Sequence, residues 1–130
     1  MPIFWVILGG GIGAGLRYIV SGKFYSLMGQ TFPWGTLGVN VIGAFLIGIV
    51  SELLSHLSAG PSVRMFLLVG LLGGFTTYSS FSLETVNLLR YGEVRLAVMN
   101  VLANNLLCIL LSLLGILGSR YMFEMLRRMV

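Results

Sequence analysis

The amino-acid sequence predicts an all-α integral membrane protein with four transmembrane helices, the third of them broken near its middle. Hydrophobic residues make up 57% of the chain and charged residues only 9%, and the mean hydropathy is +0.98. Soluble proteins carry roughly 25% charged residues, so this composition excludes an ordinary soluble domain. Four long apolar segments, separated by short polar stretches, account for most of the chain. The third segment has a polar interruption, which is why we expect a break.

The length of 130 residues limits the architecture. A bilayer core is crossed by about 20 apolar residues, which leaves room for four spans and no extramembrane domain of any size. We expect residues 1–130 to form a single four-helix domain with spans at 3–20, 34–57, 65–89 and 96–118. Residues 120–130 are expected to form an amphipathic end at the interface. No basic residue precedes Arg17, which argues against a cleaved signal peptide.

Glycines dominate the first half of the first span. Gly9 and Gly13 are four residues apart, as are Gly11 and Gly15, so each pair shares a helix face that another helix can approach closely. The run GGGIGAG also resembles a dinucleotide-binding loop, but it follows no strand and has no acidic partner downstream. Close helix packing is therefore the expected function of these glycines.

Two polar residues lie inside the second span. Thr36 and Asn40 are four residues apart and share one face of the helix. Asn40 either hydrogen-bonds a neighbouring helix, which is worth on the order of 1 kcal/mol, or lines a pore, and the sequence leaves both interpretations open. Glu52 and His56 stand near the end of the span, where both can reach the interface. We expect His56 to be an interfacial residue rather than a ligand.

The third span contains the segment GLLGGFTTYSSFSLE, residues 70–84, in which a Gly-Gly pair precedes hydroxyl and aromatic residues. Hydrocarbon offers the backbone no hydrogen-bond partner. An interrupted helix at membrane depth is therefore tolerated only where it is buried in protein or lines a polar cavity. We expect the helix to be broken near Gly73–Thr77, at a site for an ion or substrate.

Polar residues recur along the fourth span, which is otherwise almost entirely Leu, Val and Ile. They stand four residues apart and include Asn100, Asn104, Cys108 and Ser112. At this spacing they form one slowly winding stripe on the helix surface, with Asn105 just beside it. Interhelical hydrogen bonds could explain one or two such residues, but a stripe of this length is better explained by a wetted path.

Basic residues are balanced between the two sides of a four-span protein. Four are expected on each side: Arg64, Arg120, Arg127 and Arg128 with the termini, and Arg17, Lys23, Arg90 and Arg95 opposite. An imbalance of Lys and Arg between short loops sets orientation, and here there is none. The natural hypothesis is dual topology, in which copies insert in both directions and pair as an antiparallel homodimer. A pore would then form more readily at the subunit interface than within four short helices.

The residue types exclude several kinds of chemistry. The four acidic residues are dispersed and the only histidine is remote, so an enzyme is not expected. The net charge of +4 comes from basic residues scattered singly, which does not indicate nucleic acid. The third span offers hydroxyl donors, aromatic rings and backbone groups at a break. Ring edges of Phe75, Tyr78 and Phe81 suit a small anion, and carbonyls near the break suit a monovalent cation. We expect no Lys or Arg in the middle of the membrane. Without such a charge the ion is bound weakly enough to leave, which favours its rapid passage.

These motifs together resemble a known family. The run GLLGGFTTYSSFSLET, the segment GTLGVN at residues 35–40, the early GxxxR at residues 13–17 and the stripe on the fourth span closely resemble the Fluc/CrcB fluoride channels. The resemblance covers essentially the whole chain. It implies passive export of fluoride across the inner (plasma) membrane by an antiparallel dual-topology homodimer, with two pores and a central structural Na⁺.

The resemblance also implies specific residues. Backbone carbonyls of Gly73 and Thr76 would bind Na⁺. The fluoride pore would be lined by Thr36, Asn40, Tyr78, Ser80, Phe81, Asn100, Asn104, Cys108 and Ser112. Two features depart from the family pattern: Tyr78 stands where Phe is usual, and Asn104 and Cys108 stand where Ser is common.

Two alternatives belong to other classes. A small dual-topology, proton-coupled exporter of multiple drugs and other cations needs an ionisable carboxylate deep in the membrane. The first span has none, although Glu84, one turn beyond Phe81, could serve. A passive structural membrane protein would use the glycines and asparagines for packing only, but the run TTYSSFS is costly for that purpose.

Overall fold

Four helices long and apolar enough to cross a membrane make up the protein. The computed structural model describes all residues 1–130, and the four helical spans are Pro2–Met28, Trp34–His56, Pro61–Arg90 and Val94–Met129. The prediction of an all-helical protein with four spans is confirmed. The first and last spans are longer than expected, which changes the location of several charged residues.

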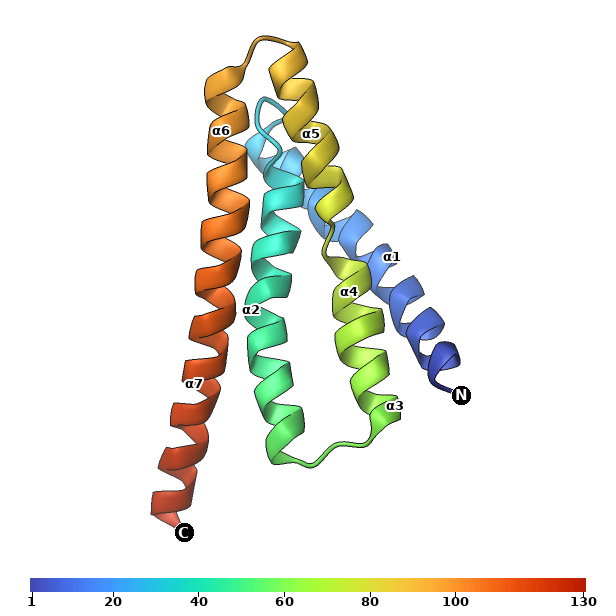
Figure 1. Cartoon of the computed structure of the whole chain (residues 1–130), viewed down its shortest axis with the longest axis vertical. Helices are drawn as coiled ribbons and strands as arrows, with labels where there is room; N and C mark the ends of the chain where they lie inside the picture. Colours follow the sequence, from blue (N-terminus) through green and yellow to red (C-terminus); the bar gives the residue numbers. More distant parts are fainter.

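The spans run alternately up and down (Figure 1). Helix α1 (Pro2–Met28) connects to α2 (Trp34–His56) at one end, and α2 connects to α3 (Pro61–Arg64) at the other. The third span continues through the π-helical segment η1 (Met65–Leu72) and α4 (Gly73–Phe75) to α5 (Tyr78–Arg90). The fourth comprises α6 (Val94–Leu102), the π-helical η2 (Ala103–Leu107) and α7 (Cys108–Met129). Both termini lie toward the end where α2 joins α3 (Figure 1).

Few side chains are buried within a single protomer. Only 22 of the 130 residues are buried, and most large apolar side chains on α1, α5 and α7 point outward. An exposed apolar surface of this extent belongs against lipid or another protein chain rather than water. The buried set is instead rich in polar side chains near the middle of the spans, including Asn40, Thr77, Asn100 and Asn104.

Glycines set how closely the spans approach one another. A Cβ atom added at Gly9 or Gly13 would collide with backbone carbonyl oxygens of η1, and one at Gly48 would collide with the backbone of α7. The predicted packing at Gly9 and Gly13 is confirmed. Gly11 and Gly15 face open space within the protomer, so the prediction that they pack against a helix is not met inside one chain.

The third span is broken where the sequence predicted. Thr76 and Thr77 have extended backbones, with φ and ψ of −83° and 159° and of −149° and 115° respectively. The two preceding glycines remain helical, and Gly74 lies against the backbone of Gly10 on α1. Thr77 begins α5, because its hydroxyl oxygen accepts a hydrogen bond from Ser80 N (3.2 Å). The break therefore follows from the threonine pair, while Gly74 permits close packing.

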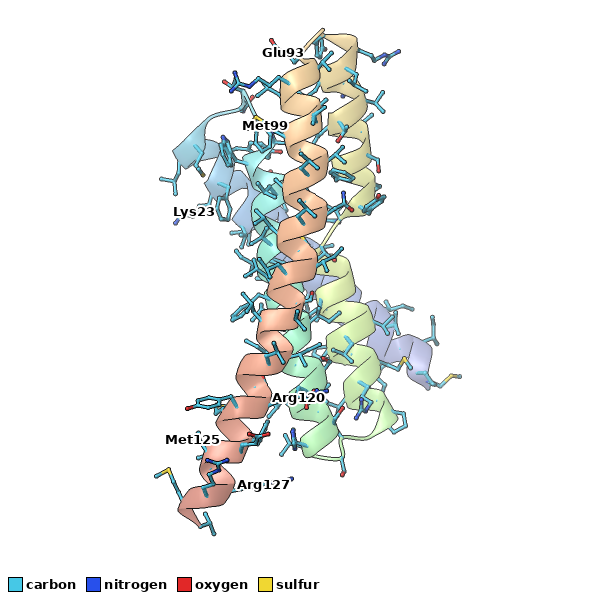
Figure 2. The ribbon with its side chains drawn as sticks, turned by 60° about the vertical axis from the view of Figure 1, so that its left-hand side comes forward. Lys23, Glu93, Met99, Arg120, Met125 and Arg127 are labelled. Carbon is cyan, nitrogen blue, oxygen red and sulfur yellow. The ribbon has the colours of Figure 1, made fainter.

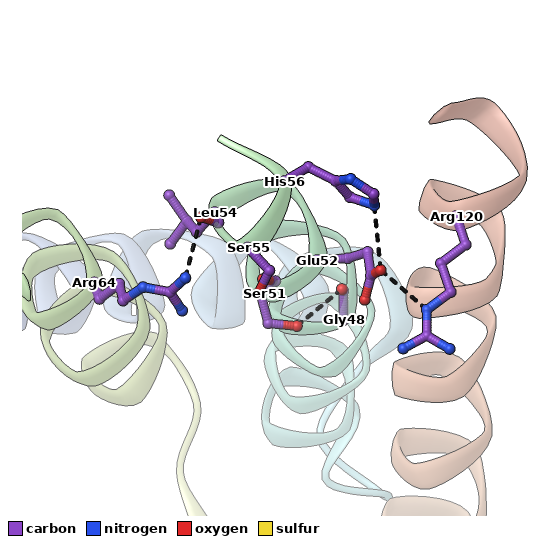
Figure 3. Close-up of polar contacts among 8 residues, drawn as sticks. All are labelled: Gly48, Ser51, Glu52, Leu54, Ser55, His56, Arg64 and Arg120. Carbon is purple, nitrogen blue, oxygen red and sulfur yellow. Dashed lines mark hydrogen bonds and ion pairs between the residues drawn. The ribbon is translucent and has the colours of Figure 1, made fainter. Parts of the chain in front are cut away.

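The carboxyl-terminal residues continue the fourth helix. Helix α7 continues without interruption to Met129 and carries Arg120, Met125 and Arg127 beyond the middle of the protein (Figure 2). Arg120 Nε lies 3.0 Å from Glu52 Oε1, and His56 lies 3.4 Å from the same oxygen (Figure 3). The ring of His56 also stacks on Phe123. These contacts to α2 support the extra turns of α7, so the fourth helix extends beyond the predicted end of the span at residue 118.

Arg17 is also misplaced by the sequence prediction. It was counted with the charges at the end of the first span, predicted at residues 3–20, but α1 continues to Met28 and Arg17 lies well inside the helix. Its Nη1 donates a hydrogen bond to the carbonyl oxygen of Thr76 at the break (3.3 Å). The expected absence of a mid-membrane Lys or Arg is therefore wrong. Three basic residues, rather than four, then remain toward the end that holds Glu93.

Candidate functional site

Asn40 holds the broken backbone of the third span. Its Oδ1 accepts a hydrogen bond from Thr77 N (2.7 Å), and its Nδ2 donates to Thr77 O (3.0 Å). These are backbone groups that the extended conformation removes from the helical hydrogen-bond pattern. An unpaired backbone group at this depth would be costly, so the side chain of Asn40 replaces the missing helical partners. Asn40 is itself buried.

A chain of hydrogen-bonded side chains extends from Asn40 to α5. Asn40 Nδ2 donates to Asn104 Oδ1 (3.0 Å), Asn104 Nδ2 donates to Asn100 Oδ1 (2.8 Å), and Asn100 Nδ2 donates to Thr85 Oγ1 (2.9 Å). The Thr85 hydroxyl donates to Phe81 O (2.8 Å). We call Asn40, Asn104, Asn100 and Thr85 the amide chain.

One backbone group orients the whole amide chain. Thr77 N–H can only donate, so it must face Oδ1 of Asn40. Asn40 Nδ2 then faces Asn104, which must present its own Oδ1, and the same requirement passes to Asn100. The direction of every amide is therefore determined by the break in the third span.

Hydrogen bonds within the protomer use most of the donors that the sequence assigned to a pore. Both N–H bonds of Asn40 are engaged, and Asn104 Nδ2 donates to both Oδ1 and O of Asn100. Ser112 Oγ donates to Ala44 O, and Thr36 donates to Glu84. Ser80 Oγ accepts from Thr77 and donates to no protein group. The interhelical interpretation of Asn40 thus holds inside the protomer, while its place in a pore stays a prediction.

A cavity of about 300 Å³ lies between α2, the break and the fourth span. Seven of the predicted site residues line it: Asn40, Gly73, Thr76, Tyr78, Asn104, Cys108 and Ser112. Tyr78 is 70% exposed, and its ring centre lies 5.0 Å from that of Phe81. Residues far apart in the sequence are therefore brought together on one side of the break.

A second cavity, of about 370 Å³, contains the remaining polar candidates of the second and third spans. Thr36 and Ser80 line it with Arg17, Tyr25 and Glu84. Phe81 and Asn100 are buried and line neither cavity. The polar stripe on the fourth span is therefore divided: Asn104, Cys108 and Ser112 reach the first cavity, and Asn100 is enclosed against α5.

Sequence reasoning missed two residues of the second cavity. Arg17 was counted with the basic residues that flank the membrane, although the span predicted at residues 3–20 includes it. Tyr25 was also placed outside the membrane, yet its hydroxyl donates to Glu84 Oε1 (3.1 Å). The apolar residues Tyr18, Ile19 and Val20 after Arg17 were the available signal that its side chain lies within the span.

The two backbone carbonyl groups predicted to bind sodium are only partly available at the break. Gly73 O has lost its usual helical donor, because Thr77 N–H donates to Asn40 instead. Thr76 O accepts a hydrogen bond from Arg17, so only its second lone pair is free. No group of three or more His, Cys, Asp or Glu side chains could hold a metal ion. A monovalent cation would thus depend on backbone carbonyls, and two per protomer are too few for a complete shell.

A comparison with protein families shows which family the chain belongs to. The family model described as "CrcB-like protein, Camphor Resistance (CrcB)" matches residues 4–116. The chain belongs to the CrcB family. The resemblance found in the sequence motifs is therefore confirmed, and the CrcB match covers all of the break and both cavities.

Curated relatives agree with this assignment. A protein of Magnetococcus marinus named "Fluoride-specific ion channel FluC" is 46% identical over 121 residues, which cover 92% of this chain and 98% of that protein. Proteins of the same name from Geobacter sulfurreducens and Parabacteroides distasonis are 48% and 43% identical over 112 and 127 residues; the matches cover 85% and 98% of this chain, and 90% and 99% of those proteins. The family is one of ion channels and not of enzymes, as the sequence predicted.

Proposed function

We propose that this multi-pass membrane protein is a fluoride-selective channel that exports fluoride passively across the plasma membrane. The names of the relatives support the substrate. The observation that carries the proposal is the break at Thr76–Thr77, which places the amino terminus of α5 inside the protein between two cavities. Helix amino termini attract anions through their free N–H groups. The alternative of a proton-coupled exporter is not favoured by relatives that are named channels.

The groups around the break suit a strongly hydrated anion that must also leave quickly. Ser80 has a free hydroxyl hydrogen, and the exposed ring of Tyr78 can turn an edge toward an anion while the buried ring of Phe81 packs beside it. Arg17 adds a positive charge beside the second cavity, but its guanidinium also donates to Thr76 O. Fluoride would therefore meet weak hydrogen-bond donors near the guanidinium of Arg17, whose charge is partly used by Thr76 O. Binding of this moderate strength permits both entry and exit.

A second, antiparallel copy of the chain completes the proposed channel. Gly73 and Tyr78 are exposed although they lie at the break and line the first cavity. Gly11 and Gly15 offer a smooth face that nothing in the protomer covers. The near balance of basic residues, four against three, gives insertion only a weak orientation preference. Two copies in opposite orientations would form two pores, each lined by both chains.

A structural Na⁺ between the two copies is part of the proposal. Gly73 O and the second lone pair of Thr76 O are the candidate ligands, and two chains would supply four carbonyl oxygens. The ion would add a positive charge that holds the two breaks together. Arg17 lies close enough to Thr76 O to compete for it, so Gly73 is the stronger ligand of the two.

Fluoride release from liposomes tests the proposal. Purified protein is reconstituted in vesicles loaded with potassium fluoride, a potassium ionophore carries the counter-current, and a fluoride electrode records release. We expect rapid fluoride release and no comparable chloride release from matched chloride-loaded vesicles. Absence of fluoride release, or equal release of chloride, would refute the proposed function.

A further inference from the structure

The carboxyl group of Glu84 has an incomplete set of hydrogen bonds. Its Oε1 accepts from Thr36 (2.7 Å) and Tyr25 (3.1 Å), whereas Oε2 is buried and has no hydrogen-bond partner. Glu84 takes part in neither of the two ion pairs, both of which involve Glu52. A buried carboxylate oxygen with neither a donor nor a cation is costly within a membrane. A proton on Oε2 would remove that cost.

The surroundings contain few charges that could stabilise an ionised Glu84. The titratable side chains that line its cavities are Arg17, Tyr18 and Tyr25 from α1, and Tyr91 and Glu93 beyond α5. Arg17 donates to Thr76 O and forms no ion pair with Glu84. From α2, only the hydroxyl of Thr36 reaches the carboxyl group.

We propose that Glu84 carries a proton on Oε2 while the channel conducts, so that this side chain places no negative charge beside the anion in the second cavity. The inference rests on the proposed function. An ionised Glu84 would repel an anion in the cavity that Ser80 and Arg17 also line. A protonated Glu84 is neutral and removes this repulsion, and Oε1 still accepts from Thr36 and Tyr25. The proton remains on Glu84 throughout.

If Glu84 has only a structural function, its charge state should not matter. Glu84 joins α1, α2 and α5 through Tyr25 and Thr36, and either charge state could do this. The substitution Glu84→Gln separates the two functions, because a glutamine keeps the accepting Oε1 and places an N–H donor where the proposed O–H group lies. Glu84→Ala removes both. Glu124→Gln, at an exposed position on α7, is the matched control.

Infrared spectroscopy of the purified, full-length protein tests the proton directly. We expect the carbonyl stretch of a protonated carboxylic acid at neutral pH, shifted in heavy water, absent from Glu84→Gln and retained in Glu124→Gln. Loss of this band with rising pH should be accompanied by a fall in wild-type fluoride flux, whereas the flux of Glu84→Gln should stay constant. Absence of the band at every pH at which the protein is folded would overturn the inference.

Fluoride flux supplies the second test. Glu84→Gln should stay within about twofold of wild-type flux at neutral pH, whereas Glu84→Ala should lose about tenfold, comparable to removal of one buried hydrogen-bonding group. A loss in Glu84→Gln equal to that in Glu84→Ala would overturn the inference. The measurements use pH values at which protein-free vesicles do not leak HF. Failure of wild-type protein to release fluoride would instead refute the proposed function, and the infrared result would stand independently.

Discussion

Polar side chains join the spans in two regions, and the two differ in charge and burial. At the centre, Asn40, Asn104 and Asn100 are neutral, buried and almost fully hydrogen-bonded. Near the termini, Glu52 contacts Arg120 and His56, and the side chain of Arg120 is 59% exposed. Exposed ion pairs contribute about 0–1 kcal/mol, whereas a buried polar group that loses its partner costs about 1–3 kcal/mol. The centre should therefore determine both stability and conduction, and the terminal cluster neither.

Asn40→Ala should have the largest effect. It leaves Thr77 N–H and Thr77 O without partners and removes the donor to Asn104, so we expect a loss of about 2–5 kcal/mol in unfolding free energy. Fluoride flux should be abolished. Thermal unfolding in detergent and the liposome assay measure the two quantities.

Asn40→Asp refines the same test, because a carboxylate still accepts from Thr77 N–H but can no longer donate to Thr77 O or Asn104. It also places a negative charge beside the first cavity. We expect flux to be lost here as well. Normal flux in the aspartate variant would remove Asn40 from the pore.

Phe81→Ile should reduce flux more than stability. Phe81 is 5% exposed, and the change to a smaller apolar side chain should cost about 1–2 kcal/mol. The aromatic edge beside Tyr78 disappears, so fluoride flux should fall by at least about tenfold while the dimer stays intact. Size-exclusion chromatography with light scattering provides the control for assembly. An unchanged flux would exclude Phe81 from anion recognition.

Tyr78→Phe should have a modest effect. The phenol hydroxyl makes no hydrogen bond within the protomer, and phenylalanine keeps the ring contact to Phe81. We expect unchanged stability and flux within about threefold of wild type, since a single unpaired hydroxyl contributes less than about 1 kcal/mol. A much larger loss in the liposome assay would show that the hydroxyl binds fluoride or the second copy.

Arg120→Gln should have the smallest effect. It breaks the 3.0 Å contact to Glu52 on an exposed surface, and His56 stays beside the same carboxylate. The expected change in unfolding free energy is below about 1 kcal/mol, with no change in flux. A loss comparable to that of Asn40→Ala would invalidate the comparison between the two regions.

The sequence allowed the fold and the location of the site to be predicted, but not the contacts within the site. The thickness of the bilayer sets how many consecutive apolar residues a spanning helix needs. The sequence has four runs of that length, and the prediction of four spans was correct. The break was also expected, because a Gly-Gly pair followed by a run of hydroxyl residues disfavours a continuous helix. The depth of Arg17 was not expected, since a charged residue can either stand at the end of a span or bind a polar group inside the protein. The choice depended on Thr76 O, which lies 59 residues away in the sequence.

The chain's composition and the spacing of its apolar residues determined that it crosses the membrane four times and that the third crossing is interrupted. Those features are local, because they follow from transfer of each segment out of water and from the backbone preferences of a few adjacent residues. Only the tertiary structure decided how Asn40, Asn104 and Glu84 are used. Each amide or carboxyl group has several possible partners, and the choice among them was made by Thr77 N–H for the amide chain and by Tyr25 and Thr36 for Glu84.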